Sequence, residues 1–163
     1  MPTVDANPLV DIRALRSDLY RLVVLLLADE NVVEVEAFRD LADAHHEAEV
    51  NRLLIWIAIA VRQLLDLDGA RAGHRCGRLL PDLSDATSER ELTFREACNK
   101  LVHAVEIIPY GLGDDPATIR ERARFEGRIT IRGRWRGKST HTVIDFRRFA
   151  ECCTALSGDF LQD

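Results

Sequence analysis

Residues 93–105, which read T-F-R-E-A-C-N-K-L-V-H-A-V, decide how the rest of the sequence is interpreted. Thr93 followed three residues later by Glu96 is a capping-box pattern, so a helix is expected to start here. At about 100° per residue, the apolar side chains of this stretch share one broad face. They are Phe94, Ala97, Cys98, Leu101, Val102 and Val105. The stretch is therefore predicted to be an amphipathic helix that packs against a core.

The opposite side of this predicted helix is polar and carries a histidine. Arg95, Asn99 and His103 follow one another at spacings of four, which aligns them on a helix, and Lys100 lies beside them. A histidine can exchange protons at neutral pH, and a nearby cation can hold a phosphate. The pattern indicates either a site that handles phosphate or an ordinary solvated helix face, and the residues alone leave both open.

Residues 98–103, C-N-K-L-V-H, resemble the signature of the HEPN superfamily, helical bundles that include many metal-independent ribonucleases. That signature is an arginine, a polar residue (often asparagine), three further residues and a histidine. Asn99 matches the polar position and His103 matches the histidine. The arginine position holds Cys98, whose thiol cannot give bidentate hydrogen bonds to phosphate. Arg95, one turn earlier, is the candidate substitute.

The resemblance implies a metal-independent endoribonuclease that acts as a homodimer, needs no cofactor, and serves a toxin or defence role. The RNA 2′-hydroxyl would attack the adjacent phosphate and leave a 2′,3′-cyclic phosphate. In this scheme His103 moves protons, Asn99 orients the phosphate, and Arg95 and Lys100 neutralise its developing charge. The cysteine at position 98 favours an alternative: a catalytically inactive helical module that binds nucleic acid or a protein partner.

A second feature is the uneven distribution of charge. The chain carries a net charge of −5, but residues 117–148 hold ten basic and three acidic side chains, a net +7, which leaves −12 elsewhere. Within this segment Ile129, Ile131 and Trp135 alternate with basic residues, a period of two that predicts a strand. Four arginines share the other side of that strand: Arg128, Arg132, Arg134 and Arg136. This row predicts either non-specific RNA binding or ion pairs with the acidic remainder, within one chain or across a dimer.

The rest of the pattern is mainly helical. Apolar residues at helical spacing predict helices over residues 8–28 and 33–67, with Trp56 in the core of the second. Residues 66–92 are aperiodic, and we expect them to form a loop. Residues 107–116, I-I-P-Y-G-L-G-D-D-P, are rich in turn formers and indicate a break in structure.

The C-terminal part is expected to hold a hairpin and a closing helix. Residues 126–136 and 140–146 are predicted to pair across a turn at residues 137–139, and Asp145 is placed to cap the last helix. A short helix over residues 116–122 is also indicated. The predicted architecture is a single domain over residues 1–163: a helical bundle with a C-terminal two-stranded antiparallel β-hairpin, about residues 125–146, and a closing helix.

The four cysteines, Cys76, Cys98, Cys152 and Cys153, show no paired metal-ligand spacing, which predicts reduced thiols. His45 and Glu49, one helical turn apart, are too few ligands for a metal site, so a solvated helix face is expected there. The longest apolar run has nine residues, too few to span a bilayer, and no basic region followed by an apolar segment opens the chain. These features predict a cytoplasmic protein without a membrane partner.

Overall fold

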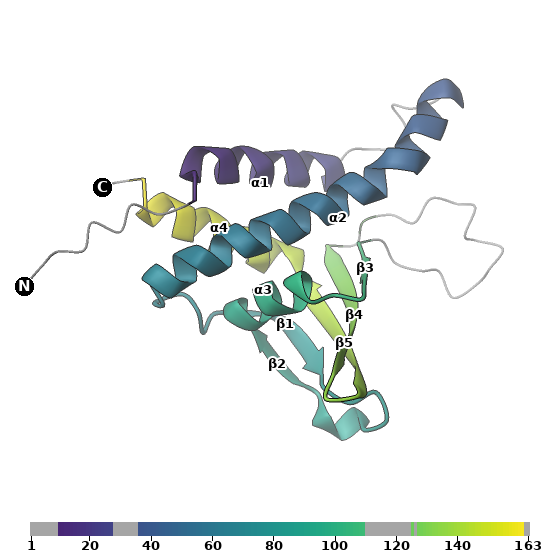
Figure 1. Ribbon diagram of the computed structural model, residues 1–163, viewed down its shortest axis with the longest axis vertical. Coiled ribbons are helices and arrows are strands. Elements are labelled where there is room, and N and C mark those ends of the chain that lie inside the picture. The colour runs from purple at the N-terminus through teal and green to yellow at the C-terminus, as the bar shows by residue number, and fades with distance from the viewer. Residues whose placement is uncertain (1–9, 28–35, 110–124, 126, 162–163) are drawn as a thin grey trace, which may run out of the picture.

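The computed structural model describes residues 10–27, 36–109, 125 and 127–161 (Figure 1). Within them the first helix, α1, spans Ile12–Leu27, and the second, α2, spans Glu36–Leu67. Asp11 caps α1, because its side chain accepts hydrogen bonds from the amides of Arg13 at 2.9 Å and Ala14 at 3.0 Å. The predicted start of this helix, at residue 8, lies outside the described residues. Helical periodicity thus located both helices.

The second half of α2 supplies much of the apolar core. Its buried side chains recur around most of the helix: Val50, Leu53, Leu54, Ile57, Ala58, Ala60, Val61, Leu64 and Leu65. Trp56 is an exception, because 51% of it is exposed to solvent. The expectation that this indole lies in the core is therefore wrong, and one strip of α2 faces solvent.

The described part of the chain contains a five-stranded antiparallel sheet, so the predicted helical bundle with a two-stranded hairpin is wrong. The spatial order is β2-β1-β5-β4-β3. The strands are β1 (Arg75–Leu80), β2 (Arg90–Thr93), β3 (Glu106–Ile108), β4 (Arg128–Trp135) and β5 (Lys138–Asp145). The hairpin that the period of two predicted is present as β4 and β5, in the middle of the sheet rather than alone.

Two of the added strands occupy the predicted loop at residues 66–92. β1 pairs with β5, which turns an expected surface connection into an interior strand. Gly77 makes this pairing possible: its φ is 154°, and a Cβ built there would lie 2.0 Å from the Val143 carbonyl oxygen. Only a residue without a side chain can approach β5 this closely. A short 3₁₀ turn, η2 (Ala86–Ser88), separates β1 from β2.

The helix predicted from residues 93–105 is α3, Phe94–Val102. The capping box is confirmed, since Thr93 accepts from the amide of Glu96 while the Glu96 side chain accepts from the amide of Thr93. The buried side is also confirmed for Phe94, Ala97, Cys98 and Leu101. The predicted C-terminal end is wrong: the helix stops at residue 102, Val105 is 74% exposed, and β3 begins at residue 106.

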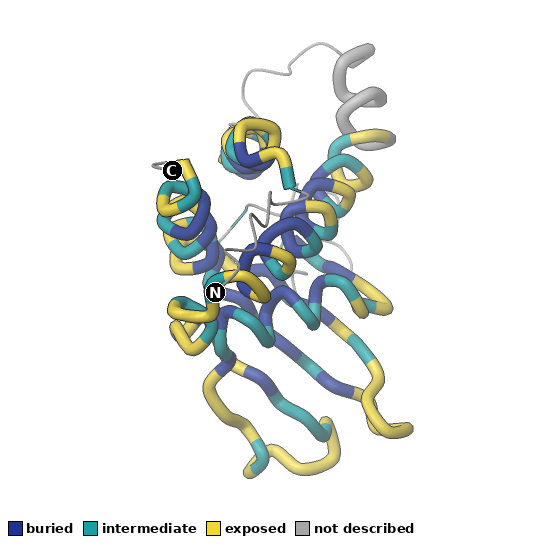
Figure 2. The backbone as a smooth tube through the Cα atoms, turned by 60° about the vertical axis from the view of Figure 1, so that its left-hand side comes forward, coloured by how far each residue is buried: buried dark blue, intermediate teal, exposed yellow. Residues whose placement is uncertain are grey.

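The helix α3 connects the two edges of the sheet. It leaves β2 at one edge and leads into β3 at the other, so it must cross the face of the sheet between them. The last helix, α4 (Phe146–Asp159), begins directly after β5 and is capped by Asp145 as predicted. It lies beside α3, where Phe149 meets Phe94 edge to face with ring centroids 5.6 Å apart. The helices α1 and α2 complete the layer above them (Figures 1 and 2).

The sheet therefore has two different faces. The inner face, which packs on the helices, carries buried residues such as Leu79, Leu92, Ile129, Ile131 and Ile144. No described helix covers the outer face, and none of its side chains is fully buried. We define the outer face as Arg75, Arg78, Leu80, Glu91, Glu106, Ile108, Arg128, Thr130, Arg132, Arg134, Ser139, His141, Val143 and Asp145. Figure 2 shows the buried stretches of the strands next to the helices and the exposed turns away from them.

The β4–β5 turn differs slightly from its prediction. It consists of Arg136 and Gly137, whose φ values of 49° and 80° are both positive, and β5 starts at the next residue. Two positive φ angles in a two-residue loop match the twist of paired strands. The predicted turn at residues 137–139 is one residue late at its start. The short helix expected over residues 116–122 lies outside the described residues.

Among the described residues, no helix is both long and apolar enough to cross a lipid bilayer.

Candidate nucleic-acid interface

The predicted catalytic arginine, Arg95, is held at the N-terminal end of α3. Its guanidinium contacts the Asp66 carboxylate at 2.6 Å and donates to the Leu65 carbonyl oxygen at 2.6 Å. Both partners belong to the last turn of α2, where unpaired carbonyl groups attract cations. Arg95 therefore ties α3 to the end of α2, and its side chain is engaged away from His103.

The other predicted catalytic residues lie farther along α3. Asn99 and Lys100 are half-buried, and burial lowers the pKa of Lys100, with the nearby Arg90 guanidinium adding to the effect. His103 is exposed and caps the end of α3, where its amide donates to the carbonyl oxygen of Asn99. The structure therefore does not join Arg95 and His103 into one cluster within a chain.

Cys98, at the position of the signature arginine, lies in the core. It is 0% exposed, and burial raises the pKa of its thiol to about 12. An arginine at this position would enter the packed layer between α3, α4 and the sheet instead of reaching solvent. The local geometry around residue 98 thus differs from what the resemblance implies for a phosphate-binding arginine.

The row of arginines predicted on β4 is present on the outer face. Alternation along β4 buries Ile129 and Ile131 and leaves Arg128, Arg132 and Arg134 exposed. Because residues two apart on a strand are separated by about 6.6–6.8 Å, the row covers about 20 Å from first to last. The predicted face is confirmed for these three side chains.

The three arginines differ in their partners. Arg132 contacts the Glu106 carboxylate of the neighbouring strand β3 at 3.1 Å. Arg128 and Arg134 have no carboxylate partner among the residues that the structure describes. Asp145, which lies opposite Arg128 in the strand register, instead contacts Arg148 at 3.5 Å. Of these three arginines, Arg132 alone forms the alternative ion pair with the acidic remainder of the chain among the residues that the structure describes.

Arginines at the other edge of the outer face are neutralised. Arg75 contacts Glu91 at 2.7 Å, and Arg78 contacts Glu89 at 3.5 Å. The unpaired positive charge is consequently concentrated on β4. Between the two edge strands lie the half-buried side chains Leu80, Thr130, His141, Val143 and Asp145, of which only Asp145 is acidic. Its carboxylate is bonded to Arg148 of α4.

The β4–β5 turn adds an aromatic ring and another cation. Trp135 is 51% exposed, and the Arg136 guanidinium lies 4.5 Å from its ring centroid. On the other side of the turn, Lys138 contacts Asp82 at 2.6 Å, which together with Ser84 lowers the pKa of Asp82 to about 2. This contact attaches the turn to the β1–β2 connection while Arg136 and Trp135 stay at the surface.

The exposure of Trp135 was missed because its position in the alternation placed it with the buried residues. The adjacent two-residue turn is the signal that could have revealed it, since the end of a hairpin extends past its covering helices. The closeness of Cys76 and Cys152, whose sulfur atoms lie 4.0 Å apart, was also missed. No local pattern connects residues so far apart in the sequence.

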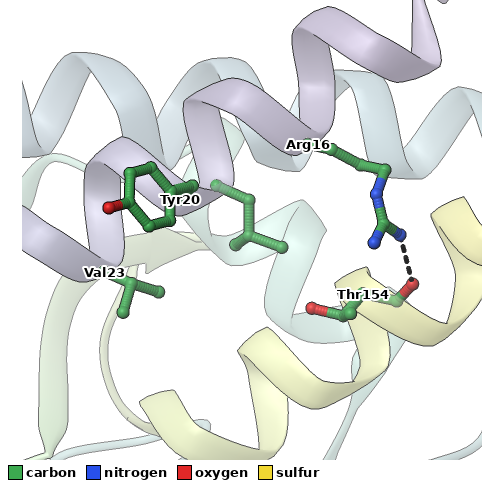
Figure 3. Close-up of a pocket in the computed structure, with 5 residues that line it drawn as sticks. Arg16, Tyr20, Val23 and Thr154 are labelled. Carbon is green, nitrogen blue, oxygen red and sulfur yellow. Dashed lines mark hydrogen bonds between the residues drawn. The ribbon is translucent and has the colours of Figure 1, made fainter.

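A separate groove of about 240 Å³ lies between α1 and α4, away from every predicted site residue. Figure 3 shows Tyr20 and Val23 on one side and Arg16, which donates to the Thr154 carbonyl oxygen at 3.3 Å, near the other end. Its lining is mostly apolar and does not hold a set of catalytic groups.

Glu49, considered earlier as a metal ligand, contacts Arg52 at 2.6 Å and Arg21 at 2.9 Å. No three potential ligands gather around a metal position in the described part of the chain.

Comparison with known proteins found no family model, no curated protein and no solved structure that matches this chain.

Proposed function

We propose that the protein binds single-stranded RNA through the outer face of β4 and the β4–β5 turn. The observation that supports this most is that Arg128 and Arg134 are exposed on an open sheet face without acidic partners among the described residues. Unpaired arginines at regular intervals attract phosphates and read no base sequence. The expected binding is therefore salt-dependent and largely independent of sequence.

The β4–β5 turn favours single-stranded RNA over duplex RNA as the ligand. A base that is free of a duplex can stack on an aromatic ring, and such stacking contributes about 1–3 kcal/mol per base. Arg136 occupies one side of the Trp135 indole, and the ring is half exposed, so a base has a surface to stack on. Arg136 itself can contact the phosphate beside that base. Trp135 belongs to the side of β4 opposite the arginines, so the RNA passes around the end of the hairpin before the row of arginines guides the neighbouring nucleotides along β4.

The test is fluorescence anisotropy of a labelled oligouridylate with Trp135→Ala and Trp135→Phe. Trp135→Ala is expected to weaken binding about 5- to 150-fold, the equivalent of one stacked base, while Trp135→Phe retains most of the affinity. Both variants are expected to fold, because the indole lies at the end of the hairpin. Equal affinity for all three proteins would remove the turn from the proposed interface.

Metal-independent cleavage of the bound RNA is a second candidate, and the position of His103 favours it. The amide of Val105 donates to the Arg132 carbonyl oxygen at 3.0 Å, so the segment that follows His103 runs alongside β4. His103 is exposed at the end of α3, on the helix side of the sheet, so RNA bound by the arginines would reach it by passing around the β3 edge. In a homodimer, Asn99 and Lys100 of both chains would contribute to the same phosphate, and no cofactor is required.

This second candidate has its own test. Purified protein in excess EDTA is expected to leave 2′,3′-cyclic phosphate ends on single-stranded RNA, and His103→Ala is expected to abolish cleavage without lowering the melting temperature or the affinity. Arg95→Ala serves as the comparison, because its contacts with α2 predict lower stability rather than a specific loss of cleavage. Cleavage that persists in His103→Ala would contradict the catalytic role and leave RNA binding unaffected.

A further inference from the structure

All four cysteines of the chain approach one another where β1, α3 and α4 meet. The sulfur atoms of Cys76, in β1, and Cys152, in α4, are 4.0 Å apart. Cys98 and Cys153 are close enough to influence the pKa values of these thiols electrostatically. Three of the four are fully buried, and Cys152 is the one that solvent partly reaches. The cluster therefore has one accessible sulfur with a buried thiol directly behind it.

Cationic groups lie on the accessible side of Cys152. The pKa of Cys152 is lowered to about 7, first because it accepts a hydrogen bond from Cys76. Partial burial opposes this shift, while His74 and Arg71 favour the negative thiolate. Arg71 is fixed by its contact with Asp159 at 2.8 Å, and its carbonyl oxygen lies 3.0 Å from Nδ1 of His74. The groups that face Cys152 are His74, Arg71, Glu151, Cys76, Cys98 and Cys153, of which Glu151 opposes the thiolate.

The buried partner has the opposite character. The hydrogen bond to Cys152 and burial both raise the pKa of Cys76, so this sulfur keeps its proton. A partly exposed thiolate beside a protonated, buried thiol is the arrangement in which one sulfur reacts first and the other resolves the product. A metal is a poorer explanation, because no three potential ligands surround a common position among the described residues.

We propose that Cys152 and Cys76 form a peroxide-reactive dithiol, in which Cys152 is the attacking sulfur and Cys76 the resolving one. The oxidant is hydrogen peroxide or an organic hydroperoxide. The Cys152 thiolate attacks one peroxide oxygen, an S–O bond forms, the O–O bond breaks, and hydroxide or alkoxide leaves. Cys152 sulfur is thereby oxidised by two electrons to a sulfenic acid, and the peroxide is reduced.

In the second step the Cys76 sulfur attacks the sulfenic sulfur of Cys152. The S–S bond forms, the S–OH bond breaks, and the departing hydroxide takes the Cys76 proton to give water. For hydrogen peroxide, two thiols and one peroxide yield one disulfide and two waters. The sulfur atoms must approach by about 2 Å to reach bonding distance. The product links β1 covalently to α4.

The experiment treats the purified full chain with hydrogen peroxide, blocks the remaining thiols with iodoacetamide, and maps the peptides by mass spectrometry. The expected result is a single linkage between Cys76 and Cys152, with free thiols falling from four to two and the melting temperature rising on the order of 10 °C. The oxidation rate is expected to rise with pH through about 7, following the thiolate of Cys152. Cys98→Ala is the matched control and should leave the linkage unchanged.

Two variants separate the roles of the sulfurs. Cys76→Ala is expected to stop at a sulfenic acid on Cys152 that dimedone labels, while Cys152→Ala is expected to lose both the label and the fast phase of oxidation. If Cys76→Ala does not fold, the peptide map of the wild-type chain still decides the matter. Four free thiols after treatment that oxidises free cysteine, or a linkage that omits Cys152, would overturn the proposal.

Discussion

Replacing Glu96 by glutamine tests how the start of α3 is stabilised. The Glu96 carboxylate accepts from Arg90 Nη2 at 2.5 Å and Nη1 at 3.1 Å, and from the amide and hydroxyl of Thr93, each at 3.0 Å. The hydrogen bonds from Arg90, followed by those from Thr93, lower the pKa of Glu96 to about 2. Glu96→Gln removes the charge and keeps the size of the side chain.

The magnitude follows from this pKa. A fall from the ordinary glutamate pKa of about 4.3 to about 2 corresponds to at most about 3 kcal/mol of folding free energy. Arg90 is half exposed, so solvent screening reduces the expected contribution to about 1–2 kcal/mol. Because the folded pKa lies below the unfolded one, this stabilisation is fully present above about pH 5 and is lost as the pH falls toward 2.

The assay is urea unfolding of wild type, Glu96→Gln and a control at pH 7 and pH 3. The control is Glu89→Gln, which removes the same charge from an exposed carboxylate 3.5 Å from Arg78. Glu96→Gln is expected to lose about 1–2 kcal/mol at pH 7 and less than half of that at pH 3, whereas Glu89→Gln changes stability by at most about 0.5 kcal/mol. Equal effects of the two substitutions, or a loss that is independent of pH, would refute the reasoning.

Two further substitutions test the packing. Cys98→Arg places an unpaired charge at a fully buried position and is expected to lower the free energy of unfolding by more than about 4 kcal/mol. The loss is measured as disappearance of the near-ultraviolet circular dichroism, and a variant that keeps a cooperative fold would contradict the burial of residue 98. Gly77→Ala brings a Cβ to 2.0 Å from the Val143 carbonyl oxygen and is expected to lower the free energy of unfolding in urea by more than about 3 kcal/mol. The control Gly73→Ala has open space around it and is expected to change that free energy by no more than about 0.5 kcal/mol. Similar stabilities for the two glycine variants would exclude the close approach of β1 to β5.

The helices could be predicted because their signals are local. The Thr93–Glu96 capping box and the buried residues of α3 are set by spacings of three and four, and the structure confirms them. β1 carries no such signal: its sequence, R-C-G-R-L-L, has a glycine in the middle and lacks the β-branched and aromatic residues that favour strands. It becomes a strand because β5 pairs with it, which is a tertiary effect.

The candidate interface was predictable where its signal is local and unpredictable where it depends on another strand. The period of two put Arg128, Arg132 and Arg134 on one face, and the structure places them on the outer face. Which of them is neutralised depends on β3, whose three residues supply Glu106 to Arg132. The C-terminal end of α3 was predicted wrongly because it also depends on β3. Residues 103–105 continue the helical pattern, but pairing of β3 with β4 takes the chain away from the helix.

The salt dependence of RNA binding tests the central claim most directly. The measurement compares three proteins: wild type, the double variant Arg128→Gln/Arg134→Gln, and the control double variant Arg13→Gln/Arg147→Gln. The control removes two exposed arginines from helices. For single strands, each phosphate contact contributes about 0.7 to the slope of log K against log salt concentration. The account predicts that the slope becomes shallower by about 1.4 for the β4 variant and stays unchanged for the control. Equal slopes for all three proteins would contradict RNA binding by the outer face.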